Sequence, residues 1–203
     1  MKRTIITISR QYGSGGRQVG EKVAAALNIP FYNHNLIDLV AYETGLASEY
    51  IANWEEQISS PRLWGVPVFG GIAPPMIEGA YYTNEDRMFA AQSKIIKDIA
   101  SKGSAVIVGR LADYLLADDP DLLSVYIYAD EKVRTMRIWQ EYGARDETEA
   151  MSHLKAIDKN RAAYIRKYAQ RDWDDYKNYH LMINSGRFGI ETSAATIVAA
   201  VRG

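Results

Sequence analysis

The feature that most constrains the fold is a β-branched segment followed directly by a glycine-rich loop and an amphipathic segment. Residues 4–8 (TIITI) are β-branched throughout, which predicts a buried strand. The loop that follows reads SRQYGSGGRQVG over residues 9–20, and apolar residues recur at helical spacing from 18 to 27. A strand, a glycine turn and a helix in this order are typical of the first unit of an α/β fold.

The same alternation continues along the chain. Further buried strands are predicted at 104–108, 122–128 and 179–183, and helices are predicted at 36–54, 84–101, 131–142, 147–167 and 190–201. Strands that alternate with helices predict a parallel sheet covered by helices on both faces. In such sheets ligands bind beyond the carboxyl ends of the strands, so residues at these ends are the first candidates for a site.

Length and composition favour one domain and exclude several classes of protein. The chain has 203 residues, and 47% of them are hydrophobic, which is enough for a full core. The net charge of −1 argues against a nucleic-acid-binding protein, and the absence of cysteine excludes disulfides and thiolate metal sites. The histidines show no metal-ligand spacing, and no apolar run approaches the roughly 18 residues of a membrane span. We therefore expect a single cytoplasmic domain, residues 1–203, with no metal site of its own and no membrane or nucleic-acid partner.

The glycine loop is suited to hold phosphate, because glycines let successive backbone N–H groups turn toward one point and the helix start adds its own. The loop contains Gly13, Ser14, Gly15 and Gly16. If residues 16–18 (GRQ) are placed on the G-K-[ST] end of the P-loop pattern, Arg17 stands for the lysine and Gln18 for the hydroxyl residue that holds Mg²⁺. Residues 13–18 also fit part of the dinucleotide fingerprint, without its third glycine, and a simple tight turn needs glycines as well. The strand before the loop and the helix after it favour phosphate binding.

Cationic residues elsewhere can complete an anion site. Arg110 directly follows a buried apolar strand, at the sheet edge where the glycine loop is also expected, which favours a ligand role over a structural ion pair. Lys155, Asp158 and Arg161 recur at i, i+3 and i+6, so they share one face of a predicted helix. Such a face is either a solvated surface with ordinary ion pairs or part of a lid over a transferring phosphoryl group.

Residues 59–82 form a long irregular segment in which prolines and glycines alternate with apolar side chains. Long loops of this kind within compact domains are often functional. The segment either folds back on the core of its own chain, or it forms a lid or a subunit contact. The apolar residues within 63–77 are compatible with a homodimer.

Five segments spread along the chain resemble a known family. They read TISRQYGSGGRQVGEKVAAALNIPFYN, VIVGRLADYLL, VYIYADEKVRTMRI, DKNRAAYIRKY and NYHLMINSGRFGIE, in this order. Together they resemble the cytidylate-kinase-like proteins, a branch of the P-loop nucleoside monophosphate kinases, over nearly the whole chain. The resemblance implies a three-layer α/β/α fold with a parallel five-stranded sheet, a monophosphate-binding region at about 33–83 and a lid region at about 143–175. It also implies phosphoryl transfer from ATP, with Mg²⁺, to a nucleoside monophosphate, usually CMP or dCMP.

The resemblance also assigns roles to individual residues. Gly109-Arg110 matches the motif whose arginine grips the monophosphate, and residues 33–35 (NHN) stand where the family carries Asp-Ser-Gly, so a charge is lost there. The lid pattern matches Asp158 and Arg161, with Lys155 as its upstream basic residue. The expected catalytic residues are Arg17, Arg110, Asp158 and Arg161, and the expected acceptor-binding residues are Asn33, Arg110, Lys155 and Arg161. The atypical loop also motivates an alternative, a nucleotide-binding sensor or scaffold with little or no kinase activity.

Overall fold

The computed structural model describes residues 3–33 and 84–203, and its centre is a parallel five-stranded sheet. The strands are β1 (Ile5–Arg10), β2 (Phe31–Tyr32), β3 (Ala105–Val108), β4 (Leu122–Tyr128) and β5 (Leu181–Asn184), in the order β2-β3-β1-β4-β5. The first strand therefore lies at the middle of the sheet, with its carboxyl end beside those of β3 and β4. The helix expected at 36–54 and the apolar segment 59–82, including its suggested role in a homodimer, lie outside the described residues.

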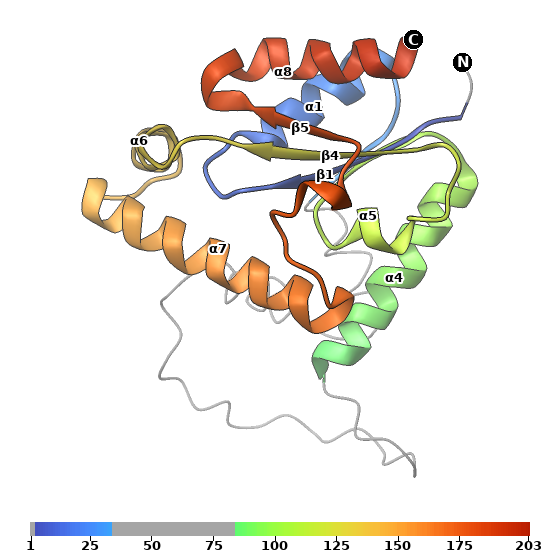
Figure 1. Cartoon of the computed structure of the whole chain (residues 1–203), viewed down its shortest axis with the longest axis horizontal. Coiled ribbons are helices and arrows are strands. Elements are labelled where there is room, and N and C mark those ends of the chain that lie inside the picture. The colour runs from blue at the N-terminus through green and yellow to red at the C-terminus, as the bar shows by residue number, and fades with distance from the viewer. Residues whose placement is uncertain (1–2, 34–83) are drawn as a thin grey trace.

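Helices cover both faces of the sheet, which confirms the predicted three-layer α/β/α fold (Figure 1). One layer holds α1 (Gly16–Leu27) and α8 (Ser185–Arg202), which pack against each other and the sheet. The opposite layer holds α4 (Asn84–Lys102), α5 (Ala112–Leu115) and α7 (Glu147–Ala169). The remaining described α-helix, α6 (Glu131–Glu141), lies past the carboxyl end of β4 and packs against α7.

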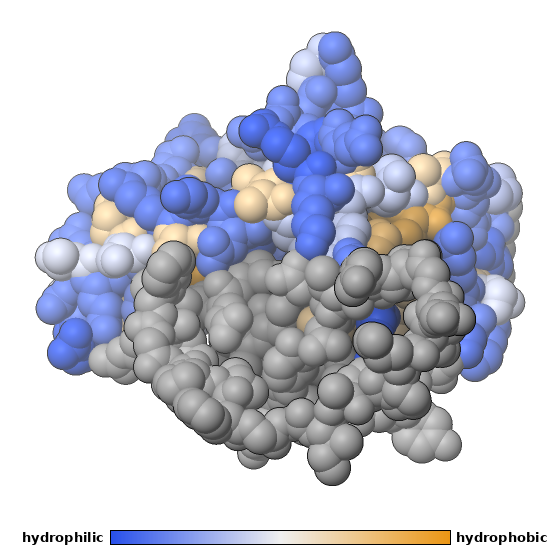
Figure 2. Space-filling model, turned by 90° about the horizontal axis from the view of Figure 1, so that it is seen from below, coloured by the Kyte–Doolittle hydropathy of each residue, from blue (hydrophilic) through white to orange (hydrophobic). Residues whose placement is uncertain are grey.

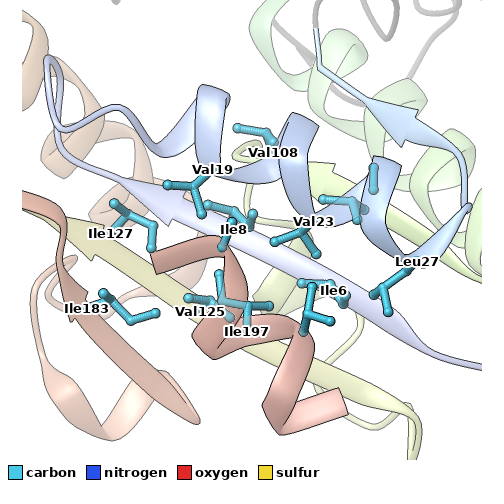
Figure 3. Packing of buried hydrophobic residues seen from close by; sticks show 14 residues of the cluster. Ile6, Ile8, Val19, Val23, Leu27, Val108, Val125, Ile127, Ile183 and Ile197 are labelled. Atoms are coloured by element: carbon cyan, nitrogen blue, oxygen red, sulfur yellow. The ribbon is translucent and has the colours of Figure 1, made fainter. Parts of the chain in front are cut away.

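The core forms because β1 is apolar on both of its faces. Ile6 and Ile8 pack against α1 and α8, whereas Ile5 points into a second cluster with residues of α4 and α5. All three isoleucine side chains are fully buried, as expected of a central strand in a parallel sheet. Burial of each contributes about 1.5–3 kcal/mol. Figure 3 shows the larger cluster, in which buried side chains of β1, β3, β4 and β5 interdigitate with those of the two helices.

Helix α1 is fixed by its ends and by its apolar face. It begins after Gly15, and it ends at Asn28, which takes the left-handed conformation common at helix ends. Val19, Val23 and Leu27, spaced four residues apart, face the sheet and α8 (Figure 3). This packing holds the first turn of α1 against the carboxyl edge of the sheet, where the glycine loop lies.

The face of the molecule on the side of α4 and α7 is mostly hydrophilic where its residues are described. Figure 2 shows polar residues over most of the coloured surface on the side of α4 and α7, with small apolar patches between them. No helix in the described part of the chain has both the length and the hydropathy to cross a bilayer.

Candidate phosphate-binding site

The loop between β1 and α1 needs glycine for its shape and for its packing. Gly13 and Gly15 have φ angles of 73° and 77°, in the left-handed region that side chains disfavour. A Cβ on Gly13 would lie 2.8 Å from the carbonyl oxygen of Arg134, and one on Gly15 would overlap the side chain of Ile190. The two glycines therefore allow a tight backbone course that neighbouring elements enclose.

The backbone amides at the start of α1 are available to an anion. Helix α1 has no side-chain cap, and no acceptor within the described ranges receives the N–H groups of Gly15, Gly16 or Arg17. Ser14 is turned away: its hydroxyl donates to the carbonyl of Gln11 at 2.8 Å, and its own carbonyl accepts from Ser185 at 2.5 Å. The hydrogen bonds of Ser14 thus hold the loop together. The free amides and the positive end of the helix dipole favour a bound phosphate.

A pocket of about 420 Å³ opens in front of these amides, within the range of small-molecule sites. It is lined by Arg10, Gln11, Tyr12, Gly13, Gly15, Gly16, Arg17, Gln18, Glu21, Asn33, Tyr142 and Arg161. The lining residues come from the loop, the end of β2, the region after α6 and the middle of α7. The fold therefore brings residues far apart in sequence to one cavity at the carboxyl edge of the sheet.

Two of the residues predicted to bind the donor nucleotide lie at the rim of this pocket. The Arg17 side chain is exposed, and its Nε donates to Glu21 at 3.0 Å along the helix. Gln18 is partly buried, and its amide nitrogen donates to Glu141 of α6 at 3.2 Å. Both side chains thus border the cavity while contacting carboxylates.

Asp158 lies behind the loop and holds it to α6 and α7. One carboxylate oxygen accepts the backbone N–H of Tyr12 at 2.8 Å, and the other accepts from the Arg134 guanidinium at 2.5 Å. Arg134 also donates to the carbonyls of Ala129 (2.9 Å) and Tyr12 (3.2 Å). With both of its oxygens engaged in this way, Asp158 has the geometry of a residue that positions the loop.

Of the other two predicted lid residues, Arg161 reaches the pocket and Lys155 does not. Arg161 donates to the backbone carbonyl of Arg10 at 3.0 Å, and its guanidinium lies 5.7 Å from the ring centre of Tyr12. Burial lowers the pKa of Arg161, because a charged group is less stable away from water. Lys155 is exposed on the same helix and does not line the cavity.

Arg110 lies at the same sheet edge, on a strained turn. Arg110 and Leu111 have φ angles of 59° and 56°, and two successive left-handed residues other than glycine cost about 1–3 kcal/mol each. Arg110 lines a smaller cavity of about 50 Å³ together with Arg161 and Tyr164, and burial lowers its pKa to about 10. Asn33 is buried at the end of β2 and lines the main pocket, whereas residues 34 and 35 lie outside the described ranges.

Arg10 is the one arginine of the site that the sequence did not indicate. It is the last residue of β1, is partly buried, and lines both the main pocket and the smaller cavity. Burial, and then the charges of Arg161 and Arg110, lower the pKa of its guanidinium. Its position mirrors that of Arg110, a cation directly at the carboxyl end of a buried strand, and this was the signal that could have revealed it.

Together, these groups form a site for a small polyanion. Three arginines from β1, the turn after β3 and α7 gather beside a helix start with free amides. Within the described ranges, no group of three or more His, Cys, Asp or Glu side chains can hold a metal ion. The chemistry of the described groups, free amides and guanidiniums, is that of an anion site.

Comparison with known proteins agrees with this chemistry. The model of the cytidylate kinase-like family matches residues 5–187. A cytidylate kinase of Methanothrix thermoacetophila is 26% identical over 199 residues, which cover 98% of each chain. Among solved structures, an uncharacterized protein from Eubacterium ventriosum is similar with a TM-score of 0.73 and 27% identity, over 99% of each chain. Shikimate kinase from Bacteroides thetaiotaomicron shares the fold, with a TM-score of 0.58 and 13% identity over 98% of this chain and 99% of that one.

Proposed function

This chain belongs to the cytidylate kinase-like family, and we propose that it transfers the γ-phosphoryl group of ATP to a nucleoside monophosphate. The observation that carries the proposal is the convergence of free amides at the start of α1 with Arg10, Arg110 and Arg161. Phosphoryl transfer depends mainly on alignment and on stabilising charge at the transferring group, and such a cluster provides both.

In this proposal the donor and the acceptor approach from opposite sides of the arginine cluster. The free amides of Gly15, Gly16 and Arg17 bind the donor phosphates, and the side chains of Arg17 and Gln18 lie at the rim of the same pocket. Arg110 and Asn33 bind the acceptor phosphate, beyond the ends of β3 and β2. Arg161 lines the cavities on both sides, so it can contact the group that passes between them.

In this proposal, phosphoryl transfer needs no covalent intermediate on a side chain of the protein. An acceptor phosphate oxygen is already anionic near neutral pH, so no side chain has to remove a proton from it. Mg²⁺ bound to ATP would neutralise part of the phosphate charge. The protein holds the two phosphates in line, and its guanidiniums stabilise the charge that spreads over the transferring oxygens.

The regions around the site take supporting roles in the proposal. Asp158 and Arg134 fix the loop in its binding conformation through the backbone of Tyr12. Residues 33–83 form the monophosphate-binding region, and residues 143–175 form the lid. Lys155 on α7 would then contact nucleotide only after the lid has closed.

A coupled assay with ATP and Mg²⁺ against every common nucleoside monophosphate tests this function. We expect turnover with at least one acceptor, and we expect Arg17→Ala and Arg110→Ala each to lower kcat by about 10²-fold or more. Arg202→Ala is the matched control, because this arginine is exposed at the end of α8 and lines neither cavity. Nucleotide binding without turnover for every acceptor would instead support a sensor or scaffold, and wild-type rates in both variants would refute the assigned roles.

A further inference from the structure

The side chain of Arg10 crosses the gap between the start of α1 and the end of β3. A Cβ on Gly16 would lie 2.6 Å from the Cβ of Arg10 and 3.0 Å from its Cγ. At its far end, the Nη1 atom of Arg10 occupies the space into which a Cβ on Gly109 would project. The Arg10 side chain thus packs against Gly16 and Gly109, and the absence of a Cβ at each glycine leaves room for it.

The backbone of the loop shows which residue stands at the lysine position of the P-loop pattern. In G-x-x-x-x-G-K-[ST], the lysine directly follows the last glycine. The last left-handed glycine here is Gly15, and helix α1 begins at Gly16. Counted from Gly15, the lysine position is residue 16 and the first glycine position is residue 10. This differs by one residue from the placement based on the sequence alone, which put Arg17 at the lysine position. The chain therefore has glycine where the pattern has lysine, and arginine where it has glycine, and these two residues are in contact.

We propose that Arg10 provides the cationic side chain that residue 16 lacks, and that it binds a phosphate of the donor nucleotide. This inference rests on the proposed function, since it names a further residue for the same site. A guanidinium suits the role because its planar fork donates two parallel hydrogen bonds to phosphate oxygens. Arg10 reaches the site from the central strand, so the rigid sheet fixes where its side chain begins.

Arg10 lacks the carboxylate partner that other arginines shielded from solvent have in the described part of this protein. Arg3 pairs with Asp119 and Asp121, Arg134 pairs with Asp158, and Arg171 pairs with Asp113. No carboxylate of the described ranges forms an ion pair with Arg10. Burial, and then the charges of Arg161 and Arg110, lower the pKa of Arg10, and this outweighs the opposite effect of the Asp158 carboxylate. A partly buried cation in such a place is stabilised by a bound anion.

An exchange of the two side chains tests the inference. Arg10→Gly should weaken ATP binding, measured by calorimetry, about 10- to 100-fold. Gly16→Lys alone should give no gain, because its Cβ meets the Cβ and Cγ of Arg10. The double variant removes that clash and restores a lysine after the last glycine, so we expect its affinity to return to within about fivefold of the wild type.

Such a recovery is not expected if Arg10 only supports the fold. Far-ultraviolet circular dichroism and the unfolding temperature establish that each variant is folded. If Arg10→Gly does not fold, Arg10→Lys and Arg10→Met replace it: the lysine should retain binding that the methionine loses. Affinity within twofold of the wild type in folded Arg10→Gly, or equal affinities of the lysine and methionine variants, would overturn the inference. A folded double variant that binds no better than Arg10→Gly would overturn it too.

A second probe separates this inference from the proposed function. Tripolyphosphate carries the phosphate chain without a nucleoside, and its binding needs no catalysis. If it binds the wild type but not Arg10→Gly, and no monophosphate is phosphorylated, the role of Arg10 stands and the kinase proposal falls. If the wild type phosphorylates a monophosphate and Arg10→Gly does so equally well, the reverse holds. If the wild type binds neither ATP nor tripolyphosphate, both are refuted.

Discussion

The ion pair between Arg134 and Asp158 connects α6, α7 and the glycine loop, and its removal should destabilise the fold strongly. Their side chains are 8% and 17% exposed, and Asp158 also accepts the N–H of Tyr12. Asp158→Ala leaves a buried guanidinium without its carboxylate, which costs about 3–5 kcal/mol. Because 1 kcal/mol lowers Tm by about 2–4 °C in a chain of this size, we expect a decrease of about 6–20 °C.

Urea unfolding and calorimetry of a double-mutant cycle measure this coupling. Arg134→Met with Asp158→Ala should lose much less stability than the sum of the single variants, since neither leaves the other unpaired. Asp172→Asn is the matched control on an exposed pair, with side chains 75% and 64% exposed, and should cost less than about 1 kcal/mol. A loss below about 1 kcal/mol for Asp158→Ala, or additive effects in the cycle, would refute a structural role for this pair.

Two further predictions concern the loop and the pH dependence of folding. Gly15→Ala places a Cβ against Ile190 in a left-handed backbone, so ATP affinity should fall at least tenfold. Gly103→Ala is the control: Gly103 also has a positive φ (153°), but a Cβ there meets open space at the amino end of β3, so binding should be unchanged in the same titration. The Arg3 guanidinium lowers the pKa of Asp119 below its ordinary value of 3.8, so this pair stabilises the fold above that pH and the stabilisation is lost as the pH falls through the depressed pKa. The stability difference between wild type and Asp119→Asn, from urea unfolding, should therefore be about 1–2 kcal/mol at pH 7 and shrink toward pH 2; a constant difference would contradict it.

The larger elements of the fold could be predicted from the sequence because the sheet is buried on both faces. Strands of such a sheet are continuous apolar runs, and the run at 122–128 corresponds to β4 residue for residue. The same reasoning does not find β2, since two residues are too few for a pattern and this strand pairs only with β3. It also misses α5, a single turn that follows two left-handed residues with side chains.

The site could be predicted only where backbone and chemistry lie in one short segment. The glycine loop shows both its shape and its affinity for anions in four residues. The spacing of Lys155, Asp158 and Arg161 correctly placed them on one helix, but it could not show that Asp158 faces a buried arginine while Lys155 faces solvent. The position of Arg10 at the end of a buried strand could be read from the sequence as that of Arg110 was, but its contact with Gly16 forms only in the folded chain.

The buried core around β1 explains how the protein can maintain a site in which charge repulsion and backbone strain oppose folding. Clustered guanidiniums repel one another, and the left-handed Arg110 and Leu111 add strain. The buried isoleucines of β1 contribute about 1.5–3 kcal/mol each, which helps to offset these costs. Since β1 supplies both Arg10 and the start of the loop, the strand that contributes most to the core also fixes the charges beside the pocket. A bound phosphate would offset the repulsion between the guanidiniums, and relief of that repulsion would contribute to the binding affinity.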